Sequence, residues 1–145
     1  MAGIWDLLNF MAQINLSTKG FNDVIDITKK VEEVVGESKI DDGVAIVFVV
    51  GSTAAITAIE YEPGLVKDIK EALEKIAPMN NNYHHEEAWH DGNGYAHIRA
   101  TLMKPSLSVP IEKGKLCLGT WQQIVLIDFD NKPREREIIV KIISS

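Results

Sequence analysis

The sequence has little of several features that define common protein classes. Its 145 residues include one cysteine, Cys117, which excludes an internal disulfide and favours a reducing, cytoplasmic setting. Because Cys117 lies between two leucines, we expect its thiol to be buried and unreactive. No uninterrupted apolar run approaches the ~20 residues that a membrane-spanning helix requires. These shortages predict a protein without disulfides that does not enter a membrane.

Positive charge is also scarce. The chain has 15 lysines and arginines against 21 aspartates and glutamates, which gives a net charge of −6. Because nucleic-acid binding depends on basic side chains that neutralise phosphates, we expect no nucleic-acid partner. The charge is unevenly spread, at −9 over residues 1–97 and +3 over residues 98–145. The basic second part suits a small phosphorylated ligand, and a solvated surface of mixed charge explains it equally well.

The apolar pattern predicts one folded domain. Apolar residues make up 46% of the chain and charged residues 25%, as in ordinary globular proteins. Alternating or continuous apolar patterns predict strands at 13–18, 21–27, 44–50, 106–111, 116–129 and 134–143. Helical spacing predicts helices at 29–38, 63–77 and 94–104, the first with Thr28 as its N-cap. Residues 54–59 fit either a strand or a short helix. Because strands and helices do not alternate regularly, we expect a single compact α+β domain with about three helices and a largely antiparallel, sandwich-like sheet.

All four histidines fall within one stretch, Tyr83–His97, at positions 84, 85, 90 and 97. Neutral imidazole is the commonest metal ligand, and histidine charge changes near neutral pH. His84 and His85 are adjacent and point to opposite sides of an extended chain, so we expect one of them to share a site with His97. The chain has neither HExxH nor a CxxC pair. A divalent metal, zinc or magnesium, on His85 and His97 and a purely structural role for these histidines therefore both stay open.

Two further segments carry candidate groups. Glu60 follows an apolar run, where burial would make it a general base or a metal ligand; a carboxylate at a helix start is as good an explanation. Gly119 is followed by Thr120, Trp121 and Gln122. An indole stacks on a planar heterocycle and an amide hydrogen-bonds to its polar edge, although a core tryptophan entering a strand explains the same residues.

A third set of polar residues is suited to an anion. Ser52, Thr53, Ser106 and Arg136 are ordinary caps or surface groups when each is taken alone. Together they offer hydroxyl donors and a guanidinium fork to an oxyanion or a phosphate. No G-x-S-x-G segment is present to indicate a serine hydrolase of the common type.

These residues stand in an order that resembles the YjbQ-type family, which is described as secondary thiamine-phosphate synthases. The pattern consists of Gly51-Ser52-Thr53-Ala54-Ala55-Ile56-Thr57 with Glu60, Tyr83-x-His85, Asn93-x-x-Ala96-His97, Ser106-x-x-Val109-Pro110-Ile111, Gly114, Gly119-Thr120-Trp121-Gln122 and Arg134-x-Arg136. The resemblance covers about residues 13–143. We therefore expect a domain over 13–145 and an N-terminal extension over 1–12.

The resemblance implies a homotrimeric enzyme that joins a hydroxymethylpyrimidine diphosphate to a thiazole phosphate and releases diphosphate. It implies Glu60, His85 and His97 as catalytic residues, the two histidines also as metal ligands. The implied substrate-binding residues are Ser52, Thr53, Asn93, Ser106, Thr120, Trp121, Gln122 and Arg136. Many family members carry histidine at the position of Gly51, so a metal site that used this histidine lacks a ligand here. The alternatives are a non-catalytic trimer that binds an anion or a metal, and a hydrolase of phosphate esters.

Overall fold

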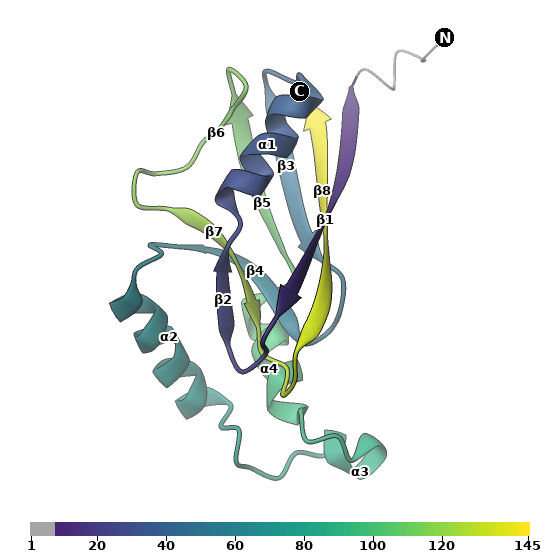
Figure 1. Ribbon diagram of the computed structural model, residues 1–145, viewed down its shortest axis with the longest axis vertical. Coiled ribbons are helices and arrows are strands. Elements are labelled where there is room, and N and C mark those ends of the chain that lie inside the picture. Colours follow the sequence, from purple (N-terminus) through teal and green to yellow (C-terminus); the bar gives the residue numbers. More distant parts are fainter. Residues whose placement is uncertain (1–7) are drawn as a thin grey trace.

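The fold consists of two antiparallel sheets that share one core (Figure 1). The structure, a computed structural model, describes residues 8–145. One sheet has the strand order β1 (Asn9–Thr18), β8 (Arg134–Ser144), β3 (Gly43–Val49), β5 (Ser106–Glu112) and β6 (Lys115–Leu116). The other has the order β2 (Asp23–Asp26), β7 (Gln123–Asp128) and β4 (Ala54–Ile59). The predicted α+β class with antiparallel sheets is confirmed.

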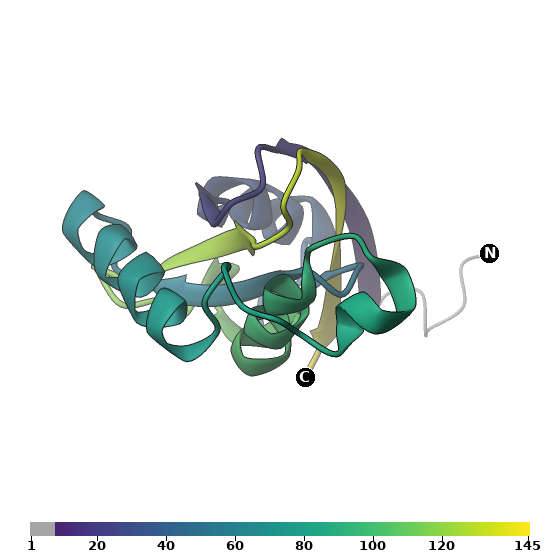
Figure 2. The same cartoon turned by 90° about the horizontal axis from the view of Figure 1, so that it is seen from below.

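Four helices accompany these sheets: α1 (Thr28–Ser38), α2 (Pro63–Ile76), α3 (His85–Trp89) and α4 (Gly94–Met103). Three of them lie where the apolar spacing predicts them. The fourth, α3, is a short helix within the histidine stretch, where five residues are too few to show a helical period. Helices α1 and α4 lie on opposite sides of the three-stranded sheet (Figure 2).

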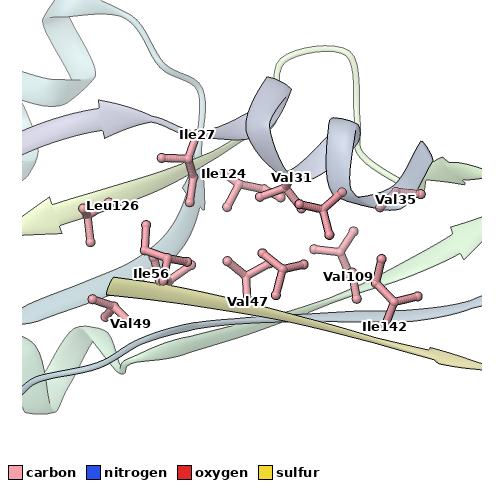
Figure 3. Close-up of a cluster of buried hydrophobic side chains, with 14 of the residues drawn as sticks. Ile27, Val31, Val35, Val47, Val49, Ile56, Val109, Ile124, Leu126 and Ile142 are labelled. Atoms are coloured by element: carbon pink, nitrogen blue, oxygen red, sulfur yellow. The ribbon is translucent and has the colours of Figure 1, made fainter. Parts of the chain in front are cut away.

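The main core fills the space between the two sheets and α1 (Figure 3). Alternate residues of β3, Ala45, Val47 and Val49, are buried there, because successive side chains of a strand point to opposite faces. Helix α1 contributes Val31 and Val35 at a spacing of one turn. The opposite face of the three-stranded sheet packs on α4 in a second core. Because both of its faces are covered, the central strand β7 is buried over its apolar length, as a continuously apolar strand should be.

A fully buried arginine anchors the C-terminal end of α2. Within α2 itself Leu73 is the buried residue, so apolar packing alone holds this helix weakly. Arg99 of α4 donates from Nε and Nη2 to the carbonyl oxygen of Ala77, at 3.0 and 2.7 Å. Its Nη1 donates to Asn22 Oδ1 at 2.9 Å, and Nη2 also pairs with Glu74 at 2.6 Å. This guanidinium therefore ties α2 to α4 and to the β1–β2 turn.

Two expected element bounds differ in the structure, and one open alternative is decided. β1 begins at Asn9 and pairs with β8 from Asn9↔Ile143 onward, so four residues of the expected extension extend this strand; residues 1–7 lie outside the described residues. Residues 54–59 form the strand β4. The predicted strand 116–129 is wrong in its first part, because β6 ends at Leu116 and an irregular segment leads to β7.

Two side chains also differ from expectation. Thr28 lies inside α1 and does not cap it; its hydroxyl donates to Asp26 Oδ1 at 2.6 Å and accepts from the N–H of Ile124 at 2.9 Å. It therefore joins the helix to β7. Cys117 is exposed in the irregular segment, so the expected burial of its thiol is wrong. Among residues 8–145, no helix has the length and apolar character needed to cross a membrane.

Candidate functional site

A polar cleft of about 300 Å³ lies where the β3–β4 loop, the β7–β8 turn and the start of α4 meet. In Figure 1 these segments gather at one end of the molecule, near α3. The cleft is lined by Gly51, Ser52, Thr53, Asp91, Asn93, His97, Asp130, Arg134 and Arg136. Strand β8, the loops before β4 and after β7, and the start of α4 thus contribute to one hollow.

The floor of the cleft rests on a buried ion pair between the two sheets. Asp128, at the end of β7, is fully buried, and Arg136 of β8 is 7% exposed. Arg136 donates from Nε and Nη2 to the two carboxylate oxygens of Asp128, at 2.6 and 2.8 Å. Thr18 donates to the same carboxylate at 2.5 Å, and Arg136 Nη2 donates to Thr53 Oγ1 at 2.7 Å. This bidentate geometry fixes the guanidinium plane of Arg136.

A second carboxylate, Asp130, organises the side chains around the cleft. It accepts from Thr53 Oγ1 at 3.0 Å, Asn93 Nδ2 at 3.2 Å and Arg134 Nε at 2.8 Å. Burial raises the pKa of Asp130. Hydrogen bonds from the Asn131 N–H and from these three side chains lower the pKa by a larger amount, so the net shift is downward. Asp130 is therefore an anion that positions its neighbours.

Several hydrogen-bonding groups in the cleft, guanidinium donors and one amide acceptor, are left over for a ligand. Among residues 8–145, Arg136 Nη1 and the two terminal nitrogens of Arg134 make no hydrogen bond. Asn93 is 4% exposed, and its Oδ1 has no partner in the described chain. Gly51 adopts φ +127°, which favours glycine, and a Cβ there would lie 3.0 Å from Arg136 Nη1. The absent side chain leaves this guanidinium edge open to the cleft.

Two imidazoles stand beside these donors. His97 lies in the second turn of α4 and His85 begins α3, and their ring centroids are 4.3 Å apart with a 45° tilt. His85 Nε2 lies 3.5 Å from Asp91 Oδ1, at the long limit of a hydrogen bond. Burial lowers the pKa of His97 and the charge of His85 lowers it further, more than Asp91, Asp130 and Glu86 raise it. His97 is therefore neutral at neutral pH.

The segment between the two histidines is held by one carboxylate. Glu86 accepts from the N–H groups of Gly92 and Gly94, at 2.5 and 2.9 Å. The bond from Gly92 is the main cause of a lowered pKa for Glu86. Asn131 in the β7–β8 turn donates to the Asp91 carbonyl oxygen at 2.7 Å. These bonds place His85 and Asp91 at the edge of the cleft.

The lowered pKa of His97 predicts a pH dependence of stability. The unfolded chain protonates this residue near the ordinary pKa of about 6.5, and the folded chain does so only at lower pH. The contribution of neutral His97 to stability is thus complete above the ordinary pKa and is lost as the pH falls through the folded pKa. In urea unfolding between about pH 7.5 and about pH 5, we expect His97→Gln to lose less stability on acidification than the wild type. Parallel losses in the two proteins would contradict this assignment.

The cleft collects part of the predicted site. Ser52, Thr53, Asn93, His97 and Arg136 line it, and His85 touches it through the ring contact with His97. Residues that sequence reasoning did not select are Asp91, Asp128 and Asp130, while Arg134 appeared only within the family pattern. Their signal was the spacing: Asp128-x-Asp130 ends an apolar strand, and Arg134-x-Arg136 places two guanidinium groups on one face of the next strand.

The remaining predicted residues lie elsewhere in the subunit. Glu60 is exposed rather than at the edge of the core, and it follows β4 seven positions after Thr53, a strand distance of roughly 23 Å. Thr120, Trp121 and Gln122 precede β7 at that same far end, and Trp121 is 73% exposed. Ser106 is exposed and pairs with Phe48 on the outer face of the five-stranded sheet. One subunit therefore does not unite these residues with the histidines.

The donor set of the cleft does not fit a metal held by this chain alone. Among the described residues, no group of three or more His, Cys, Asp or Glu side chains is arranged to hold a metal ion. His85 and His97 offer two imidazoles, but Gly51 adds no side chain and the guanidinium groups of Arg134 and Arg136 bring positive charge. A structural zinc site needs four ligands and a catalytic one usually three from the protein. A metal at His85 and His97 stays a prediction, and the chemistry of the site is derived below from side chains alone.

Relatives of this chain share its fold over nearly their whole length. A family model described as UPF0047 protein YjbQ-like matches residues 12–145. A UPF0047 protein of Archaeoglobus fulgidus is 43% identical over 129 residues, which cover 89% of this chain and 98% of that protein. A second, from Methanocaldococcus jannaschii, is 37% identical and covers 94% of this chain and 96% of its own.

Solved structures agree with these sequence matches. A YbjQ-like protein of unknown function from Sulfolobus solfataricus superposes with a TM-score of 0.89 at 36% identity, over 94% of this chain and 98% of that one. A member of the YjbQ/UPF0047 family from Clostridium acetobutylicum gives 0.83 at 42% identity, over 91% and 99%. The resemblance found in the motifs is thereby confirmed, and the chain belongs to the YjbQ-like family of UPF0047 proteins.

Proposed function

We propose that this protein is an enzyme that acts on a small phosphorylated substrate in the cleft between Gly51 and Arg136. The observation that carries the proposal is the set of unused guanidinium nitrogens on Arg134 and Arg136, which face the same hollow as the neutral imidazole of His97. Guanidinium groups match the geometry of phosphate oxygens. An imidazole that is neutral at working pH is able to accept a proton.

The reaction that we propose is the thiamine-phosphate synthase reaction suggested by the motifs. In it, the bond between the pyrimidine methylene carbon and the diphosphate oxygen breaks, and the thiazole nitrogen forms a new bond to that carbon. Diphosphate leaves with the electron pair of the broken bond. Arg134 and Arg136 stabilise the charge that develops on the leaving group, which is the usual source of the largest rate gain. The leaving diphosphate gains one negative charge and takes up a proton, which His97 and His85 pass to it from solvent at the edge of the cleft.

A complete site in this proposal needs a second subunit. Glu60 and Trp121 lie at the opposite end of β4 and β7 from the cleft, so they join it only if a neighbouring copy supplies them. An uncovered apolar face supports assembly, because Met11, Phe48 and Ile143 are 64, 39 and 38% exposed on the outer side of the five-stranded sheet. Apolar patches of this kind mark interaction surfaces. The proposed assembly is the homotrimer, in the cytoplasm.

The direct test gives the purified protein both substrates and follows thiamine phosphate by chromatography. Formation of product with release of diphosphate supports the synthase, and light scattering reports the trimer. Elemental analysis of the same sample tests the metal at His85 and His97. If folded, trimeric protein forms no product in an assay that detects less than one product molecule per subunit, the synthase proposal is wrong.

Arg134 provides a separate test of phosphate binding. Its terminal nitrogens are unpaired, so Arg134→Gln removes ligand donors. The substitution also removes the Nε partner of the buried Asp130, which keeps its hydrogen bonds from Thr53 and Asn93. We expect the dissociation constant for inorganic phosphate, measured by calorimetry, to rise about tenfold or more. Lys132→Gln, an exposed substitution two residues away, is the matched control and should change it little. If both variants bind inorganic phosphate with equal affinity, phosphate does not bind at Arg134.

A second candidate function is a non-catalytic anion-binding protein. The specific observation in its favour is that the ring-stacking and amide groups, Trp121 and Gln122, are remote from the cleft within one subunit. Stabilisation by phosphate in a thermal unfolding experiment, without turnover of either substrate, favours this candidate, because selective binding to the folded state raises apparent stability. Release of phosphate from simple esters favours the third possibility, a hydrolase.

A further inference from the structure

A second, smaller hollow adjoins the polar cleft. It has a volume of about 200 Å³ and shares three lining residues with the cleft, namely Gly51, Ser52 and His97. Its other walls are Ala54, Ala100, Thr101 and Pro105. The two hollows therefore meet along the β3–β4 loop and the imidazole of His97.

The two hollows differ in chemistry. The cleft contains the guanidinium groups, the buried amide of Asn93 and the carboxylate of Asp130. The smaller hollow is walled by Ala54 of β4, by Ala100 and Thr101 of α4, and by Pro105 just after that helix. The Thr101 hydroxyl already donates to the carbonyl oxygen of His97 at 2.7 Å. Beyond the three shared residues, the smaller hollow thus presents mainly apolar surface.

Gly51 keeps the junction between them open. It lines both hollows, and any side chain there would approach Arg136 Nη1. The unpaired nitrogens of Arg134 and Arg136 mark the cleft as the polar end of a ligand. The buried amide oxygen of Asn93 also lacks a partner among the described residues, and as an acceptor it is available to a hydroxyl group of the ligand or to a water. The adjoining recess offers apolar contacts, which a free phosphate ion does not make because it has no apolar part.

We infer that the two hollows are one bipartite site for a phosphate monoester. The phosphate lies against Arg134 and Arg136, a single small ring occupies the recess beside Ala100 and Thr101, and His97 stands next to the ester oxygen at the junction. A cavity of roughly 150 Å³ accommodates benzene, so the recess has room for one ring. This inference rests on the proposed phosphate binding in the cleft and adds the class of its organic part.

The test compares inorganic phosphate with phenyl phosphate, which carries the same anion on one six-membered ring. Calorimetry of the wild-type protein should give about tenfold tighter binding of phenyl phosphate, because burial of the ring adds apolar contact. Thr101→Phe places a ring of the protein itself in the recess from an exposed helical position. It should bring the two affinities together while leaving that of inorganic phosphate unchanged. Thr101→Val, of the original size, should retain the preference.

The outcomes separate the two proposals. If Thr101→Phe leaves the preference intact, or weakens inorganic phosphate equally, the recess does not hold the ring and the inference is overturned. If neither ligand binds the wild-type protein, both the bipartite site and the phosphate site of the proposed function are wrong. If Thr101→Phe folds poorly, the wild-type protein decides the question. Nuclear Overhauser effects between the bound phenyl protons and the Ala100 methyl group would place the ring in the recess. Their absence overturns the inference.

Discussion

Replacing Asp128 by alanine is expected to lower the free energy of unfolding by about 3–5 kcal/mol. The substitution removes the two carboxylate acceptors of Arg136. Its buried guanidinium then keeps only the Thr53 hydroxyl and the Asp130 carboxylate at 3.8 Å. Thr18 loses the shorter of its two hydrogen bonds as well. Urea unfolding monitored by circular dichroism measures the change. Glu135→Ala is the control, because that exposed carboxylate accepts a single hydrogen bond, from Ser17, and should contribute less than about 1 kcal/mol.

A double variant separates lost packing from unpaired charge. Asp128→Ala combined with Arg136→Met removes both charges, and it should be more stable than Asp128→Ala alone, because the main cost of the single substitution is the buried guanidinium left unpaired. If the double variant is less stable than the single one, the pair contributes through packing instead. A loss below about 1 kcal/mol for Asp128→Ala would mean that water reaches Arg136 readily.

The second large effect concerns turnover. In the proposed synthase reaction, His97→Ala should lower kcat by about 10²–10⁴-fold, the range for loss of a general acid or base. His84→Ala is the matched control: its side chain is 98% exposed beside Glu87 and lies in the same stretch without lining the cleft. A rate within a few fold of wild type for His97→Ala, in folded trimeric protein, would exclude a proton-transfer role.

Most of the fold follows from apolar periodicity. The continuously apolar run at 44–50 predicts a strand buried on both faces. The strand β3 forms there, but the burial on both faces is wrong, because Phe48 is exposed on the outer face. Pro63 and Pro78 frame α2 as expected. The histidine stretch gave no periodic signal for α3, whose ends depend on the Glu86 bonds to Gly92 and Gly94. The segment 117–122 was mistaken for strand because Trp121 is a typical strand residue, whereas here it is exposed in a turn.

The candidate site was harder to predict, because a sequence motif does not say at which end of the sheet its residues lie. Thr53 and Glu60 are close in sequence, yet β4 separates them by its full length. Conversely, Thr53 and Arg136 are 83 positions apart and meet because β4 and β8 begin at the same side of the sandwich. Asp128 lies in the predicted strand and Asp130 in the turn that follows it, and only the contacts with Arg136 and Arg134 reveal their role.

The ion pair beneath the cleft joins a strand of one sheet to a strand of the other. Separating the two sheets therefore also breaks the floor of the cleft. We expect the amide protons of β7 and β8 beside it to exchange with solvent through global opening of the molecule. A ligand in the cleft consequently acts on the lifetime of the whole domain, and any adjustment to its shape has to come from the histidine stretch at the rim.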